Sequence, residues 1–173
     1  MDSAIVEATA NSDSLKFSHV GILDVSDSGE VSVIEASPRH GVVITSLDEF
    51  IKNSDNGAVV KRLDMNYPVN TVIENAKSFL GIDYDWWYLP DNDKIYCSEL
   101  VEKSYVNYDG TPVFPTIPMN FRNGDDEIPA FWQELFDKLG MQVPEGVAGT
   151  NPSQISHFPK LKLVCRFKNT PNY

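Results

Sequence analysis

Hydrophobic and polar residues alternate along several short stretches of the chain, mostly in its first third. Alternation with a period of two predicts strands, because successive side chains of a strand point to opposite faces. Strands gathered early, with helices interspersed later, indicate an α+β fold with a mostly antiparallel sheet. The predicted strands cover residues 17–25, 30–36, 41–45, 57–63 and 161–167.

Apolar residues at helical spacing predict four helices. Ser46 is expected to cap the first of them, with Glu49 as its capping-box partner. Pro68 lies near the first turn of the second helix, and Gly81 ends it. Residues 109–126, which contain several prolines and glycines, are expected to form an irregular connection. The predicted helices cover residues 47–53, 66–81, 97–108 and 129–140.

The composition is ordinary for one globular domain, which is expected to span residues 1–173. The formal charge of -11 argues against nucleic acid as a partner and disfavours a sustained hold on an anionic membrane. The chain has no run of about 18 apolar residues, so no transmembrane segment is expected. The N-terminal residues show no signal peptide. A cytoplasmic location is therefore expected, unless an upstream export signal was removed and the protein is exported or in the cell envelope.

The two cysteines differ in their surroundings. Cys165 falls on the apolar face of the last predicted strand, where a free cysteine usually behaves as a small buried hydrophobe. Cys97 begins a predicted helix, whose unpaired N–H groups and dipole can stabilise a thiolate and an oxyanion. From the pattern alone, Cys97 is equally well a packed structural thiol or a nucleophile.

A thiol nucleophile needs an imidazole, and the chain has three histidines. His40 falls in a polar turn, and His157 falls in a polar segment before the last strand. His19 shares a predicted strand face with apolar residues, where a histidine is usually a satisfied core residue. Gly21, two residues on, leaves space beside the ring for another group. This context favours His19 over His157 as the partner of Cys97.

Glu35 interrupts the apolar face that Val31 and Val33 form on the second predicted strand. A buried carboxylate needs a partner. An imidazole that faces a cysteine would be such a partner, and the carboxylate would then orient the ring as in a catalytic triad. The alternative is that Glu35 lies at the strand end and reaches solvent.

These candidates lie within blocks that resemble a known family, the YiiX-like branch of the NlpC-type papain-like cysteine hydrolases. The resemblance covers nearly the whole chain. The His-Val-Gly-Ile block precedes the cysteine helix, which is the order of the circularly permuted branch, shared in outline with lecithin retinol acyltransferase-like proteins. The matching blocks are FSHVGIL, VIEASPRHGVVITSLDEFI, GIDYDWWYLPDNDKIYCSELV, IPMNF and VPEGVAGTNPSQIS.

The resemblance implies a permuted papain-like fold, in which the sheet packs against the helix that starts at the catalytic cysteine. It implies that Cys97 is the nucleophile, His19 the base and Glu35 the residue that orients the base. Tyr84 and Tyr96 are expected to bind substrate or the oxyanion. Relatives usually begin with a Gly-Asp-Leu strand before a segment like SAIVEAT, so this strand is expected to be missing or replaced.

Three functions are consistent with these residues. The leading hypothesis is an amidase or peptidase that cleaves an amide bond in a small peptide or acyl-amide substrate, such as a cell-wall-type peptide. A lipid-directed thioesterase or acyltransferase of the same permuted fold is the second, and a non-catalytic binding module is the third. No cofactor is expected, and no metal site, because the possible zinc ligands are not clustered in the sequence.

Overall fold

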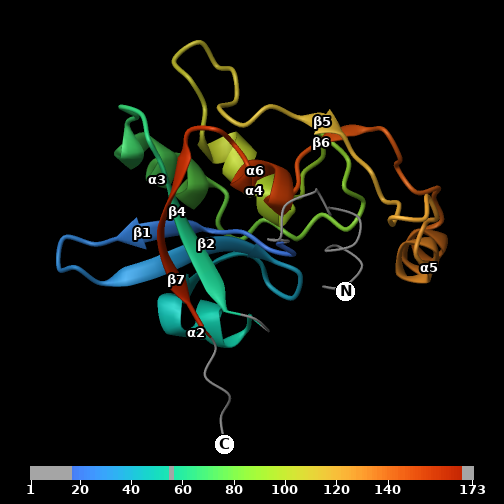
Figure 1. Cartoon of the computed structure of the whole chain (residues 1–173), viewed down its shortest axis with the longest axis horizontal. Coiled ribbons are helices and arrows are strands. Elements are labelled where there is room, and N and C mark those ends of the chain that lie inside the picture. The colour runs from blue at the N-terminus through green and yellow to red at the C-terminus, as the bar shows by residue number, and fades with distance from the viewer. Residues whose placement is uncertain (1–16, 55–56, 169–173) are drawn as a thin grey trace, which may run out of the picture.

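The computed structural model describes residues 17–54 and 57–168 of the chain. They form an α+β fold with antiparallel sheets, as the alternation predicted (Figure 1). The SAIVEAT segment, and with it the expectation about the first strand, lies outside the described residues. None of the helices within the described ranges is long and apolar enough to cross a membrane.

The first sheet is an antiparallel meander of three strands. β1 (Ile22–Val25), β2 (Val31–Ser37) and β3 (Gly41–Ser46) lie in that order, with Glu35 opposite Val43. Helix α2 (Leu47–Lys52) follows directly and packs against β2 and β3. The Ser46 hydroxyl accepts the backbone N–H of Glu49 at 3.2 Å, so the predicted N-cap is confirmed.

Helices α3 (Val69–Ser78) and α4 (Cys97–Ser104) pack against each other and against this sheet, α3 on β1 and α4 on β2. Alternate side chains of β2 point to opposite faces, yet four consecutive residues of this strand are buried, so both of its faces are covered. The helices cover one face, and burial of apolar area between them and β2 forms the main core. Its most buried members include Ile34, Ala36, Val42, Val72, Ala76 and Leu100.

The rest of the fold consists of short elements around the cysteine helix. β4 (Ala58–Leu63) and β7 (Leu161–Phe167) form an antiparallel ribbon, and β5 (Ile117–Pro118) pairs with β6 (Ala148–Gly149). Helix α5 (Ala130–Leu139) lies at one side of the molecule, and α6 (Pro152–Ser156) lies beside α4 (Figure 1). β5, β6 and α6 were not predicted, because two to five residues give no periodic signal.

Three details differ from the expectations. The first strand begins at Ile22, so His19 precedes β1 and does not lie within it. The cysteine helix ends at Ser104, and Tyr108 lies beyond it with its side chain 99% exposed. Cys165 is half-buried, because β7 pairs only with β4 and leaves Leu163 and Val164 about half exposed.

Gly21 allows the segment before β1 to approach β2 closely. A Cβ atom at this position would lie 2.5 Å from Val33 Cγ1 and 3.1 Å from the carbonyl oxygen of Ile34. The first distance is shorter than real Cβ contacts and the second is tight, so a larger residue would require Val33 or β2 to shift. The space expected beside His19 is therefore occupied by β2, the strand that carries Glu35.

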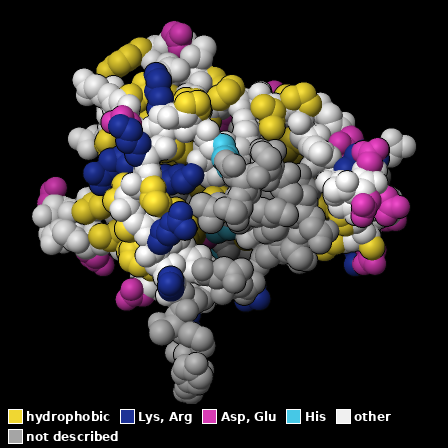
Figure 2. Space-filling view, in the orientation of Figure 1, with side chains coloured by type: hydrophobic (Ala, Val, Ile, Leu, Met, Phe, Trp, Pro, Cys, Tyr) yellow, Lys and Arg dark blue, Asp and Glu magenta, His cyan; other side chains and the backbone are white. Residues whose placement is uncertain are grey.

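Charge is distributed unevenly over this acidic chain. Figure 2 shows Lys and Arg side chains gathered over the β4–β7 side of the molecule, with Asp and Glu side chains mostly around its edge. Although the net charge is -11, the β4–β7 side of the molecule is therefore locally basic. The basic residues of the ribbon and its flanks are Lys61, Arg62, Lys160, Lys162, Arg166 and Lys168.

Candidate active site

Cys97 is the first residue of α4, and its side chain is buried with 5% exposure. Tyr96 precedes it in an extended conformation, and its carbonyl oxygen accepts the N–H of Leu100 at 3.0 Å. The N–H groups of the first helical turn have no partner within the helix, and the helix dipole is positive at this end. Negative charge on the Cys97 sulfur, or on an oxygen bound beside it, is therefore stabilised there.

His19 and Glu35 form a hydrogen-bonded pair next to this helix end. His19 Nε2 lies 2.6 Å from Glu35 Oε2, and the Thr45 hydroxyl donates to Glu35 Oε1 at 2.6 Å. Glu35 is 8% exposed, so it does not reach solvent at the strand end. Although burial alone would raise its pKa, the hydrogen bonds from His19 and Thr45 lower the pKa of Glu35 below its usual value.

The His19 ring connects Glu35 to Cys97. Burial alone would lower the pKa of His19, but side-chain hydrogen bonds with Cys97 and Glu35 and the charges of both raise it to about 10. Because Glu35 holds Nε2, the ring nitrogen that is left for the thiol is Nδ1. The structure thus brings the three residues together in the order Cys97, His19, Glu35.

The segment before β1 is held by the far end of the chain. The backbone N–H of Phe17 donates to Ser153 Oγ at 3.0 Å, and the Ser153 hydroxyl is 3.4 Å from the carbonyl oxygen of Phe17. Ser153 belongs to α6, which packs against the cysteine helix. The position of His19, which is not fixed by a strand ladder, therefore depends on α6 as well as on Glu35.

Tyr84 lies beside the thiol because its backbone pairs with the residues before Cys97. Ile95 donates to the carbonyl of Asp83 at 3.1 Å and accepts the N–H of Asp85 at 3.2 Å. Burial, the nearby Tyr88 hydroxyl and Cys97 all raise the pKa of Tyr84 well above its usual value. Its hydroxyl therefore stays protonated and can donate a hydrogen bond at the sulfur.

Tyr96 contributes to the site in a different way. Its hydroxyl accepts the backbone N–H of Thr150 at 3.1 Å, and its ring lines the cavity beside Cys97. The Ser98 hydroxyl donates to the carbonyl oxygen of Thr150 at 3.0 Å. The segment that follows β6 is thus fixed to the first turn of α4 from both sides.

Asp85 organises the loop between Tyr84 and the cysteine helix. It is fully buried, and its carboxylate accepts the N–H groups of Trp87 and Leu89 and the side-chain amide of Asn92. These bonds fix the loop that places Tyr88 in the cavity wall. No role for Asp85 was predicted from the sequence. An aspartate side chain often accepts the backbone N–H two residues later in a turn, and this tendency could have indicated its role.

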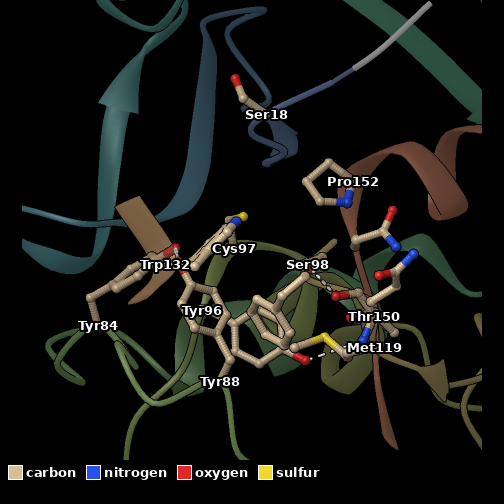
Figure 3. A pocket seen from close by; sticks show the side chains of 13 residues that line it. Ser18, Tyr84, Tyr88, Tyr96, Cys97, Ser98, Met119, Trp132, Thr150 and Pro152 are labelled. Carbon is tan, nitrogen blue, oxygen red and sulfur yellow. Dashed lines mark hydrogen bonds between the residues drawn. The ribbon is translucent and has the colours of Figure 1, made fainter. Parts of the chain in front are cut away.

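A cavity of about 50 Å³ lies beside Cys97 (Figure 3). Figure 3 shows Tyr84, Tyr88 and Tyr96 on one side of Cys97, and Ser98, Met119, Thr150 and Pro152 on the other. Sequence reasoning missed Trp132, Thr150 and Met119 as lining residues, because only the tertiary fold brings α5 and β6 to this place. The other lining residues are Ser18, Asn120, Phe121, Trp132 and Asn151.

The other two histidines have different surroundings. His40 lies in an exposed turn between β2 and β3, as expected. His157 ends α6, and its Nδ1 lies 2.6 Å from the carbonyl oxygen of Ser153. Within the ranges that the structure describes, neither is placed against Cys97 by a hydrogen bond or ion pair that the structure shows.

Glu99 is buried one turn into the cysteine helix, 3.3 Å from Lys103 Nζ. Its Oε2 accepts the backbone N–H of Tyr96 at 3.4 Å. Burial raises the pKa of Glu99 to about 7, although the charge of Lys103 acts in the opposite direction. Between about pH 4.5 and pH 7, the folded protein therefore keeps a proton on Glu99. The unfolded chain, in which this carboxyl has its ordinary pKa of 4.5, has already released it.

The raised pKa of Glu99 predicts a loss of stability between about pH 4.5 and pH 7, because the native carboxyl resists ionisation there. Glu99→Gln keeps the acceptor for Tyr96 and removes the charge. We expect this variant to be more stable than the natural chain above neutral pH by about 3 kcal/mol, and equally stable at about pH 4. Denaturant unfolding at both pH values measures the difference. Glu134→Gln on the exposed side of α5 is the control, and equal stability of all three proteins above neutral pH would contradict the assignment.

A cysteine at a helix start, a histidine just before a sheet and a carboxylate on that sheet, with the histidine first in the chain, are the arrangement of permuted papain-like proteins. Residues 3–165 match the family described as permuted papain-like amidase enzyme, YaeF/YiiX, C92 family, and the chain belongs to it. The predicted fold and family are therefore confirmed.

Two relatives agree with this assignment. The chain is 26% identical over 154 residues to the uncharacterized protein YiiX of Escherichia coli strain K12, covering 87% of this chain and 74% of that protein. A crystal structure of "metalloprotein yiiX" from Escherichia coli O157:H7 superposes with a TM-score of 0.77, at 26% identity, over 96% of this chain and 90% of that one. Within the described parts of this chain, no three His, Cys, Asp or Glu residues are grouped so that they could hold a metal ion.

Proposed function

We propose that this member of the amidase family hydrolyses amide bonds through a thiolate at Cys97, with His19 as acid and base and Glu35 as the residue that orients it. The observation that carries the proposal is the hydrogen-bonded chain from Glu35 through His19 to Cys97 at the start of α4. A packed structural thiol would need none of these partners.

Each residue has a distinct role in the proposed reaction. The Cys97 sulfur attacks the amide carbonyl carbon, and the carbonyl oxygen becomes an oxyanion. The backbone N–H of Cys97 and the Tyr84 hydroxyl donate to that oxyanion. The His19 imidazolium then gives its proton to the leaving amine, so the amine departs and a thioester remains.

Water completes the cycle. His19, now neutral, takes a proton from a water molecule, whose oxygen attacks the thioester carbonyl and displaces the Cys97 sulfur. Glu35 stays ionised throughout and stabilises the imidazolium whenever it forms. The products are a carboxylic acid and an amine, and the thiolate–imidazolium pair is restored.

The family description, permuted papain-like amidase, favours a small peptide or acyl-amide substrate, such as a cell-wall-type peptide, over a lipid. A non-catalytic module would not need the ionised partners that surround Cys97.

Selective alkylation tests the reactivity of Cys97. Accessibility alone would make half-buried Cys165 react before Cys97, which is 5% exposed. Only a thiolate reacts rapidly with iodoacetamide, so we expect Cys97 to be labelled first at about pH 6. Peptide mass spectrometry distinguishes the two sites. Preferential labelling of Cys165, or equal labelling of both, would contradict the thiolate at Cys97.

A further inference from the structure

Two buried polar side-chain atoms have no hydrogen-bond partner among the described residues. They are Trp132 Nε1 and Thr150 Oγ1, in side chains that are 3% and 1% exposed. Buried polar groups are nearly always paired, and each unpaired one costs about 1–3 kcal/mol. Two such atoms in one protein therefore need an explanation.

Both atoms belong to residues that line the cavity beside Cys97. Trp132 comes from α5, and Thr150 follows β6, so two separate elements each contribute to the cavity wall a residue with an unpaired polar atom. The segment at Thr150 is fixed to α4 through Tyr96 and Ser98, so the threonine is held firmly. Unpaired groups that converge on a cavity next to a nucleophile are expected where a substrate supplies the missing partners.

The walls of the cavity limit the kind of group that it accepts. None of the lining residues is Asp, Glu, Lys or Arg. An anionic group would lose its hydration there without gaining an opposite charge, beside the proposed Cys97 thiolate. A cationic group could not accept a hydrogen bond from the indole N–H of Trp132. A purely apolar group would leave both polar atoms unpaired. A small, uncharged, polar group meets both conditions.

The donors and acceptors specify this group further. An indole N–H only donates a hydrogen bond, whereas a threonine hydroxyl both donates and accepts. A primary carboxamide has a carbonyl oxygen that accepts and an NH₂ group that donates. We propose that the cavity is a substrate subsite for an uncharged carboxamide, such as an asparagine side chain. Trp132 Nε1 donates to the carbonyl oxygen, and Thr150 Oγ1 accepts from the amide.

This subsite rests on the proposed amidase function, and it is tested first by the substrate preference. The substrates to compare are fluorogenic dipeptide amides that carry asparagine, aspartate or leucine at either of the two positions before the cleaved bond. We expect kcat/KM to be higher for asparagine than for its two near-isosteres by about 10-fold or more. Leucine pairs neither atom, and aspartate would lose its hydration without gaining an opposite charge.

Two variants connect the preference to the unpaired atoms. In Trp132→Phe and in Thr150→Val, the ratio of asparagine to leucine turnover is expected to fall towards one. Trp87→Phe, a tryptophan outside the cavity lining, is the matched control and should keep the ratio. Equal turnover of the three substrates by the natural chain, or an unchanged ratio in both variants, would overturn the subsite.

A binding measurement separates the subsite from catalysis. In ¹⁵N-labelled Cys97→Ala protein, the indole N–H resonance of Trp132 is identified by its loss in Trp132→Phe. N-acetylasparagine N-methylamide, whose only primary carboxamide is its side chain, should shift this resonance, and N-acetylleucine N-methylamide should not. A shift without hydrolysis of any reporter would retain the subsite and refute the amidase. Hydrolysis without a shift would retain the amidase and refute the subsite.

Discussion

Replacing His19 with alanine is expected to abolish both hydrolysis and the selective labelling of Cys97. Among the residues that the structure describes, the His19 imidazole is the group that connects Glu35 to the thiol and can accept and return its proton. Loss of one member of such a set lowers the turnover number by about 10⁴-fold. An acyl-transfer assay and a cysteine-directed acyl probe measure the two effects.

His157 is the internal comparison for this experiment. It follows Cys97 in the chain, as the histidine of an unpermuted papain-like enzyme would, but it bonds to Ser153 within α6. His157→Ala is expected to keep labelling and turnover close to those of the natural chain. His19→Gln, which retains a hydrogen bond to Glu35, is a second variant in case His19→Ala does not fold. Circular dichroism verifies that each protein is folded. Loss of labelling in His157→Ala, with labelling retained in His19→Ala, would refute the permuted site.

Replacing Glu35 with glutamine is expected to shift the pH dependence of the site. The amide can still accept from His19 and can donate to Thr45, but it has no charge to hold the imidazolium. The pKa of His19, raised to about 10 in the natural chain, should fall. We expect kcat/KM at neutral pH to decrease by about 10²-fold, with the alkaline limit of activity at lower pH.

The same change affects stability in a defined pH range. A histidine whose pKa is raised on folding stabilises the native state fully below its ordinary value of 6.5 and ceases to do so as pH rises through about 10. In Glu35→Gln this loss should begin at lower pH. An NMR titration of the His19 ring and a pH–rate profile measure the shift, with Glu30→Gln, on the exposed turn before β2, as control. An unchanged profile would mean that Glu35 does not orient the ring.

Local patterns in the sequence singled out two of the three central residues as candidates. Glu35 lies among valines on a predicted strand, and Cys97 lies where a predicted helix begins, but the patterns left a structural alternative open for each. Their catalytic roles were implied by the family resemblance, and the register that places Glu35 opposite Val43 was not predicted. His19 was selected for its neighbours Gly21 and Glu35, although it lies before the strand that was predicted to contain it.

The walls of the cavity could not be predicted in the same way. Trp132 falls within the predicted helix 129–140, and packing against Tyr88, Phe121 and Phe136 buries it. Its unpaired indole N–H is visible only when α5 is placed against the rest of the fold. Thr150 lies in a turn-rich segment whose path is fixed by hydrogen bonds to Tyr96 and Ser98. Each of these residues is more than fifty positions from Thr150 in the chain, so the contacts leave no local signal.

The hydrogen bonds between Phe17 and Ser153 make the placement of His19 depend on a segment near the end of the chain. They join residues 136 positions apart, and they hold the segment that carries His19. A polypeptide interrupted before α6 would still contain Cys97, His19 and Glu35, yet the base would have lost one of its two anchors. The nucleophile would thus become fully active only after almost the entire polypeptide has been synthesised and folded, so unfinished chains would carry little hydrolytic activity.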